Sequence, residues 1–335
     1  MSLPRIQHMP LARLVLLVLL LLSARPIQAF TLITFDVDGT LVSSSGWAES
    51  AHGRAYPKAV AEVFQAETTE KGLSEVPAVP AILSTPEFHG STDGLILLRL
   101  ARAALDIQTT QSTPKLADMM EHMYSYIASL DDEDVGRGLT VLPGVLELLN
   151  YLSTFPRTEL MCGLVTGNVE GIARRKMSSV GIFQTGALSP PPPSQRSKEW
   201  SGAEHIGFLG GFGSDYCSGN LEDPNRNHLD RSEQIHIAVE RCREVLSERP
   251  IRRVIHVGDA PADVLAARAY YERVSQSEGA DGGDVCVGVV GVATGSYPAD
   301  HLRELAGEMV EGRWEPVVLE GGLADAKGFL KACCL

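Results

Sequence analysis

The sequence has little positive charge. Its 335 residues include 29 Lys and Arg against 42 Asp and Glu, which gives a formal net charge of −13 at pH 7. Because phosphate backbones attract basic surfaces, this balance argues against a nucleic acid as the partner. A small phosphorylated substrate stays open, since it needs only a local positive site.

Metal-binding cysteine patterns and internal repeats are also missing. The six cysteines show no Cys-x-x-Cys spacing, so we do not expect a zinc site. Cys162 and Cys286 lie within apolar, strand-like runs and are expected to be buried thiols. The cysteines therefore predict neither a metal framework nor a particular disulfide pairing.

The longest apolar run is confined to residues 11–22, after Arg5 and before several small residues. This layout is typical of a secretory signal or an organelle-targeting segment. The run is short for a membrane span, and Arg13 interrupts it. We therefore expect residues 1–29 to direct an otherwise soluble protein to the secretory pathway or to an organelle such as a plastid. The alternative is a signal anchor, and membrane contact is expected only if the segment stays uncleaved.

A second short apolar run, Thr31 to Phe35, ends in two acids one residue apart, Asp36 and Asp38, followed by Gly39. The run predicts a buried parallel strand. Open α/β sheets bind ligands beyond the carboxyl ends of their strands, and alternate residues of an extended chain share a face. We therefore interpret the two acids as a nucleophile beside a proton donor. The alternative is a strand followed by an ordinary Asp-Gly turn.

Strands alternate with helices in most of the chain. Three further apolar runs predict buried strands at residues 160–165, 253–257 and 285–290. Helical patterns between them imply a parallel sheet that is covered on both faces. From about residue 43 to residue 140 the pattern is helical throughout, which interrupts the alternation directly after the first strand.

The predicted fold class is therefore α/β, with a Rossmann-like, doubly wound parallel sheet as the core. We assign residues 30–42 and 141–335 to this core, and residues 43–140 to an inserted, all-helical cap domain. Residues 189–213 and 275–284 are rich in small and polar residues and predict long loops. The acid run Asp131 to Asp134 is expected to be a solvated loop rather than a metal site, because it lacks ordered ligand spacing.

Polar residues follow two more of the predicted strands. Thr166-Gly167-Asn168 follows the run at 160–165, and a hydroxyl with backbone N–H groups at a strand–helix turn is a natural phosphate donor. Gly258-Asp259, with Asp263 four residues later, follows the run at 253–257. The alternative for both is helix capping, for which Thr, Asn and Asp are well suited.

These motifs, in this order, resemble those of the haloacid-dehalogenase-like superfamily over about residues 32–305, beginning with the run from Asp36 to Thr40. The resemblance implies that Asp36 forms an aspartyl-phosphate, and that Asp38 protonates the leaving oxygen and then activates water. Dehalogenases of this superfamily lack the second acid, so Asp38 argues against that activity. A neutral Asp38 needs a raised pKa, which a nearby carboxylate can provide.

The resemblance also assigns phosphate and metal ligands. The expected phosphate-binding residues are Thr166, Gly167, Asn168 and Arg231. Arg231 is expected just before a helix, where it would neutralise the nucleophile and clamp phosphate; Arg226 and Lys198 are its rivals, and a surface cation is the alternative. The expected Mg²⁺ ligands are Asp36, Asp38 through its backbone carbonyl, Asp259 and, more remotely, Asp263.

The sequence therefore predicts a Mg²⁺-dependent phosphatase that acts on a small phosphorylated metabolite. A run from His89 to Asp93 resembles a turn in phosphoglycolate-phosphatase-like members, which favours 2-phosphoglycolate as substrate; helix capping is the alternative reading of this run. His52 is a weaker candidate in the same region. Two alternatives remain for the whole chain: a phosphosugar mutase of the same superfamily, and a non-catalytic binding protein. The oligomeric state stays open.

Overall fold

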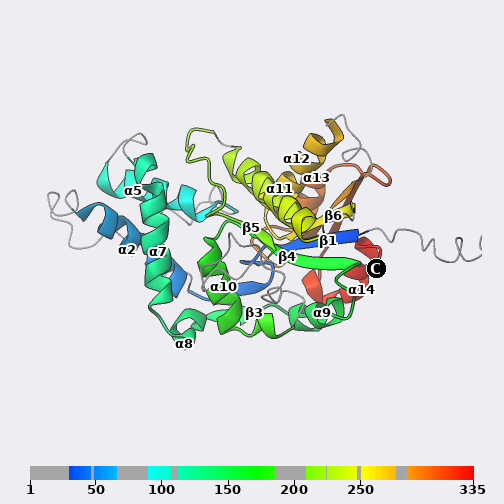
Figure 1. Cartoon of the computed structure of the whole chain (residues 1–335), viewed down its shortest axis with the longest axis horizontal. Helices are drawn as coiled ribbons and strands as arrows, with labels where there is room; N and C mark the ends of the chain where they lie inside the picture. Colours follow the sequence, from blue (N-terminus) through cyan, green and yellow to red (C-terminus); the bar gives the residue numbers. More distant parts are fainter. Residues whose placement is uncertain are drawn as a thin grey trace, which may run out of the picture.

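A six-stranded sheet forms the centre of the computed structural model (Figure 1). All neighbouring strands in it run parallel. In spatial order the strands are β5 (Gly210–Phe212), β4 (Leu160–Thr166), β1 (Phe30–Phe35), β6 (Ile251–Gly258), β7 (Cys286–Val292) and β8 (Trp314–Leu319). Strand β1 lies inside the sheet and is buried along its whole length, as its continuous apolar run predicts.

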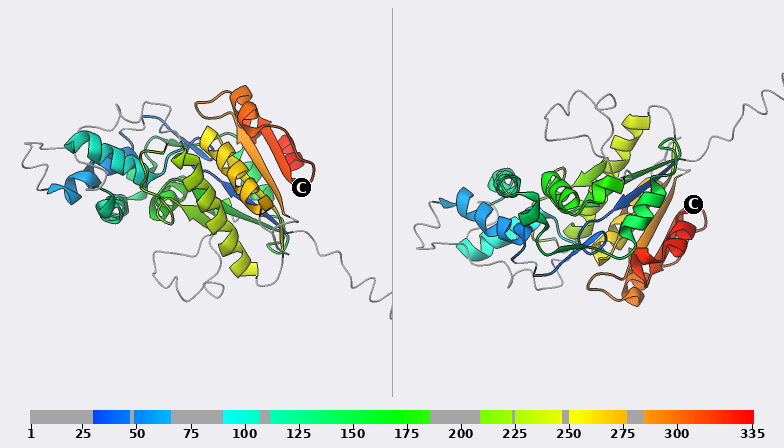
Figure 2. Two further views of the ribbon diagram at one scale, coloured as in Figure 1. Left: turned by 90° about the horizontal axis from the view of Figure 1, so that it is seen from above. Right: turned by 90° about the horizontal axis from the view of Figure 1, so that it is seen from below.

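Helices cover both faces of this sheet, so the predicted α/β class with a doubly wound parallel sheet is confirmed (Figure 2). Alternate residues of β1 face opposite layers: Ile33 and Phe35 pack in one buried cluster, Phe30 and Leu32 in another. The first layer contains α9 (Val145–Leu152), α10 (Glu170–Ser179) and α14 (Ala326–Ala332). The second contains α11 (Arg226–Leu246), α12 (Pro261–Gln276) and α13 (Ala299–Ala306).

A small antiparallel ribbon joins the core to a helical unit. It pairs β2 (Val42–Ser44) with β3 (Leu139–Val141). The elements that the structure describes between them are α2 (Ala51–Val63), α5 (Asp93–Leu105), the 3₁₀ turn η3 (Thr113–Lys115), α7 (Leu116–Ala128) and α8 (Asp132–Gly136). The four helices share an apolar cluster, to which Val169 and Ile172 of the core also contribute, and they lie at one end of the molecule (Figure 1). The exact domain boundaries stay a prediction.

Three local predictions from the sequence were wrong. The pattern expected to be helical from about residue 43 instead begins with strand β2 and ends with strand β3, because these two distant segments supply each other's hydrogen-bonding partners. The acid run forms α8, because the Asp131 carboxylate accepts a hydrogen bond from the Asp134 N–H at 2.7 Å and caps the first turn. Residues 210–212 form edge strand β5, where a side chain on Gly211 would collide with the Gln234 carbonyl oxygen of α11.

The structure describes residues 30–46, 49–65, 90–106, 112–185, 209–223, 225–246, 250–276 and 285–335. The predicted targeting segment and most of the two predicted long loops lie outside these residues. Among the residues described, no helix is long and apolar enough to cross a membrane. Two further 3₁₀ turns complete the elements described, η4 (Ile182–Thr185) and η7 (Gly322–Ala324).

The C-terminal helix α14 is part of the core, which gives a test of the fold. Phe329 is fully buried and stacks on Phe35 of β1 with ring centroids 6.1 Å apart. Phe329→Ala should lower the free energy of unfolding by about 3–5 kcal/mol, because it removes buried area and leaves a cavity. Urea unfolding followed by circular dichroism measures this loss. Met309→Ala is the control: its side chain is 65% exposed, and it should change stability by less than about 0.5 kcal/mol.

Candidate active site

Three neighbouring strands end in polar residues at one edge of the sheet. Asp36 follows β1, Asp259 follows β6, and Thr166 ends β4. These strands are adjacent, in the order β4-β1-β6, and all run in the same direction. Their carboxyl ends therefore meet, and the structure brings the predicted site residues together there.

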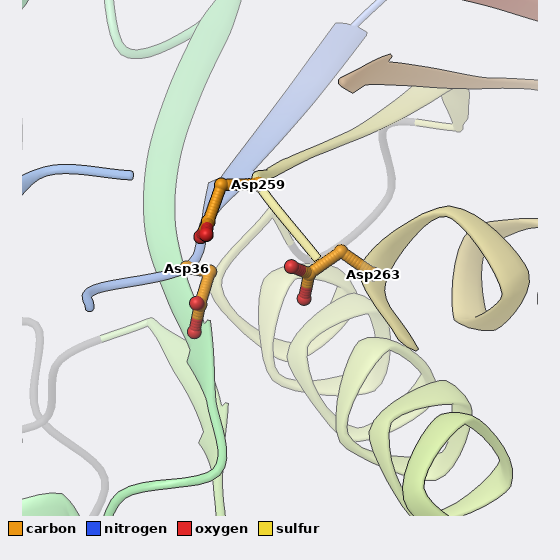
Figure 3. Close-up of side chains that lie close together, drawn as sticks. All are labelled: Asp36, Asp259 and Asp263. Atoms are coloured by element: carbon orange, nitrogen blue, oxygen red, sulfur yellow. The ribbon is translucent and has the colours of Figure 1, made fainter. Parts of the chain in front are cut away.

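A cluster of three carboxylates lies at this edge. Oxygens of Asp36, Asp259 and Asp263 lie within 4.8 Å of one another, and all three residues are buried. Figure 3 shows Asp36 and Asp259 side by side, with Asp263 reaching toward them from the first turn of α12. Thr40 donates a hydrogen bond to Asp259 at 3.1 Å and holds that carboxylate in place.

The electrostatics of the cluster show an excess of negative charge. Burial raises the pKa of the Asp36 carboxyl to about 6, against the opposing effect of Arg231. Burial, together with repulsion from Asp263 and Asp36, also raises the pKa of Asp259 well above its usual range. Burial opposes ionisation of Asp263 as well, but Arg231 and His256 outweigh it and lower its pKa. A cation between these carboxylates would relieve the repulsion.

This donor set fits Mg²⁺, which prefers hard carboxylate oxygens and keeps several waters. Asp36 and Asp259 are the residues best placed to hold the ion, with Asp263 beside them. The carboxylate of Asp38 lies outside the cluster found here. The predicted contribution of its backbone carbonyl stays a prediction.

Arg231 supplies the cation of the cluster. Its Nη1 lies 2.6 Å from Asp36 Oδ1 and 3.1 Å from Asp263 Oδ1, and its side chain is only 2% exposed. Although burial lowers the pKa of Arg231, the two carboxylates outweigh burial and raise it. Arg231 was expected just before its helix, whereas α11 begins five positions earlier at Arg226. The residue therefore projects from the second turn of the helix.

Of the two rivals for this role, the structure describes only Arg226. Arg226 lies beside Asp230, with Nε 3.4 Å from Oδ1, on the same helix. Lys198 lies outside the described residues.

The predicted phosphate loop, Thr166-Gly167-Asn168, packs directly against the helical unit. The Asp93 N–H donates to the Gly167 carbonyl oxygen at 2.7 Å, and a side chain at Gly167 would collide with the Ser91 carbonyl oxygen. Both side-chain N–H groups of Asn168 already have partners, Asp38 Oδ2 at 3.0 Å and Thr166 Oγ1 at 3.2 Å. The Asn168 side chain is therefore engaged within the protein, and phosphate binding by the backbone N–H groups of this turn stays a prediction.

Asp38 has a different environment from the one predicted. Its two oxygens lie 2.9 and 2.8 Å from the Lys176 ammonium. Burial raises the pKa of Asp38, but Lys176 and His52 outweigh burial and lower it. The expectation of a raised pKa for Asp38 was wrong, because the Lys176 ammonium, 138 residues further along the chain, lies against this carboxylate.

Lys176 is the main site residue that the sequence analysis missed. A usable signal was present: within α10, residue 176 falls on the same helical face as Ile172, Ala173 and Met177, which are all buried. A lysine is almost never fully buried unless it is paired. Its position therefore indicated a buried carboxylate partner.

The run that ends in Asp93 does not present this side chain to a substrate. The Asp93 carboxylate accepts hydrogen bonds from Tyr56 Oη at 2.6 Å and from the Val169 N–H at 2.7 Å. It also lies 3.3 Å from His52 Nε2. Thr92 caps α5 by accepting from the Leu95 N–H, so the capping interpretation is correct for this residue. His89 lies outside the described residues.

No model of a protein family matches the chain, and no curated protein matches it. Similar solved structures include β-phosphoglucomutase from Clostridium difficile, at 14% identity and a TM-score of 0.41, over 92% of this chain and 97% of that chain. A proposed β-phosphoglucomutase from Bacteroides vulgatus has 14% identity and a TM-score of 0.43, over 94% and 93%.

A third similar structure is L-2-haloacid dehalogenase from Xanthobacter autotrophicus with chloropropionic acid covalently bound. It has 15% identity and a TM-score of 0.35, over 90% of this chain and 98% of that chain. At these identities and TM-scores, functional conclusions must come from the side chains of this chain.

The carboxylate cluster leads to a prediction on metal binding that needs no substrate. At a Mg²⁺ concentration about 100 times the dissociation constant, binding should add about 2.7 kcal/mol to the free energy of unfolding. Asp259→Asn should abolish this increment, because it removes a ligand charge from the cluster. Urea unfolding with and without Mg²⁺ measures the increment. Asp300→Asn, at a side chain that is 93% exposed, should keep it, and loss in both variants would contradict the assignment.

Proposed function

We propose that this chain is a haloacid-dehalogenase-like phosphatase that hydrolyses a small phosphate monoester with the help of Mg²⁺. One observation carries the proposal: the Asp36 carboxylate at the end of the central strand lies 2.6 Å from the buried Arg231 guanidinium and beside Asp259 and Asp263. A nucleophile, a fixed cation and carboxylates suited to a divalent ion are the components that phosphoryl transfer needs.

In the proposed reaction, Asp36 attacks the phosphorus atom and the ester P–O bond breaks, which leaves an aspartyl-phosphate. The leaving oxygen takes a proton from Asp38. Water then attacks phosphorus while Asp38 accepts its proton, so phosphate is released and Asp36 is regenerated. Arg231 stabilises charge on the transferring oxygens. When bound, Mg²⁺ would neutralise charge that builds up on the phosphoryl group.

The ionised state of Asp38 beside Lys176 supports its role as the base in the second step. Its role as the acid in the first step rests on the sequence resemblance. The presence of both acids at this edge also favours phosphate esters over organohalides, because halide leaves without a proton.

The substrate is proposed to be a small phosphorylated metabolite, with 2-phosphoglycolate as the first compound to test. A mutase of the same superfamily uses the same core residues, and its product would keep the phosphate. Delivery to the secretory pathway or an organelle through residues 1–29 is a separate proposal, which microscopy of a C-terminal fluorescent fusion would test.

Phosphate release from a panel of phosphate monoesters tests the proposed activity. The protein should turn over at least one ester with Mg²⁺, and EDTA should stop the reaction. Asp36→Asn should reduce the rate to background, because a carboxamide does not form the acyl phosphate. Asp38→Asn should lower kcat by about 10²–10⁴-fold.

Asp300→Asn should match the wild type in the same assay, since its side chain lies in solvent. Conversion of an ester to an isomer without phosphate release would identify a mutase. Mg²⁺ binding without turnover of any ester would instead indicate a binding protein.

A further inference from the structure

Lys176 makes an unusual set of contacts for a lysine on a helix. It is 3% exposed, and its ammonium lies 2.9 and 2.8 Å from the two oxygens of Asp38 and 2.8 Å from Asn168 Oδ1. These three acceptor atoms match the three N–H groups of an ammonium. The burial cost of the charge is therefore offset by a specific partner, and that partner is the proposed proton-transfer residue.

Asn168 closes this network into a triangle. Its Nδ2 donates to Asp38 Oδ2 at 3.0 Å, while its Oδ1 accepts from Lys176. Asp38 is thus held by two side chains from the loop and helix that follow β4. The Asp38 side chain is still 36% exposed, so it is anchored and accessible at the same time.

The network also keeps Asp38 separate from its neighbours. Only one residue lies between Asp38 and Asp36, yet the Asp36 carboxylate belongs to the cluster with Asp259 and Asp263, and that of Asp38 does not. Each of the two acids pairs with a different buried cation: Arg231 contacts Asp36, and Lys176 contacts Asp38. Without Lys176, no ion pair described at this edge would hold Asp38 in its present position.

We propose that Lys176 is a positioning residue, which holds the Asp38 carboxylate in place for proton transfer and away from the Asp36–Asp259–Asp263 cluster. Asn168 completes this support. The inference rests on the proposed function, because Asp38 transfers protons only in that reaction. Lys176 acts through Asp38 and not through contact with the substrate.

A double-mutant cycle tests this dependence. Turnover of p-nitrophenyl phosphate is measured for the wild type, Lys176→Met, Asp38→Asn and the double variant. This ester is chosen because p-nitrophenolate leaves without a proton donor, which keeps the rates of the Asp38 variants measurable. Lys176→Met should lower kcat by roughly 10- to 100-fold with little change in KM. In the Asp38→Asn background, the same substitution should change kcat by less than about twofold.

Two further variants separate positioning from a general loss of structure. Lys176→Arg keeps the charge and should recover part of kcat. Arg174→Met on the same helix removes a cation that is 12% exposed and pairs with Glu170, and it should leave kcat unchanged. Losses that multiply in the double variant, or an equal loss in Arg174→Met, would overturn the role of Lys176.

A spectroscopic measurement tests the ion pair independently of turnover and of the folding of the Lys176 variants. In full-length protein labelled with ¹⁵N-lysine, a buried, paired ammonium exchanges slowly and should give a persistent Nζ resonance. Asp38→Asn should shift or abolish this resonance, and a spectrum without it would overturn the proposal. A folded wild type that turns over no ester would overturn the proposed function, whereas an active wild type with multiplicative losses would overturn only the role of Lys176.

Discussion

The site depends on how four carboxylates coexist at one buried edge of the sheet. Asp36, Asp38, Asp259 and Asp263 repel one another, and burial strengthens the repulsion because water no longer screens it. Arg231 and Lys176 offset part of this charge from opposite sides, one from α11 and the other from α10. Together with burial, the negative charge that these two cations do not offset raises the pKa of Asp259 most, and it makes the edge suitable for a divalent cation.

The strands that end at this edge could be predicted from the sequence, and so could the three acids at the carboxyl ends of β1 and β6. Each strand is a continuous apolar run, because both of its faces are covered, and parallel strands bring their carboxyl ends together whatever their order. Local pattern and topology thus sufficed for Asp36 and Asp259. Arg231 was expected from the family resemblance, and the start of the helix that carries it was placed too late.

What the sequence did not reveal depends on partners that are distant in the chain. Strand β2 exists only because β3 pairs with it, and β5 only because its glycines let α11 approach closely. The lowered pKa of Asp38 and the use of the Asn168 amide both follow from Lys176, which lies on a neighbouring helix. A residue's own motif indicates its chemical type, whereas its protonation and orientation are decided by tertiary neighbours.

The β2–β3 ribbon has a consequence for how this protein can vary. The chain leaves the core along β2 and returns beside it along β3. The segment between these two strands is therefore a single excursion that begins and ends at the same place on the core. None of the six strands of the sheet lies in that excursion, whose contacts with the site edge include those of Asp93 with Gly167 and Val169. Changes in length at points of the excursion away from these contacts should therefore leave the strand order, and with it the spacing of Asp36 and Asp259, unchanged.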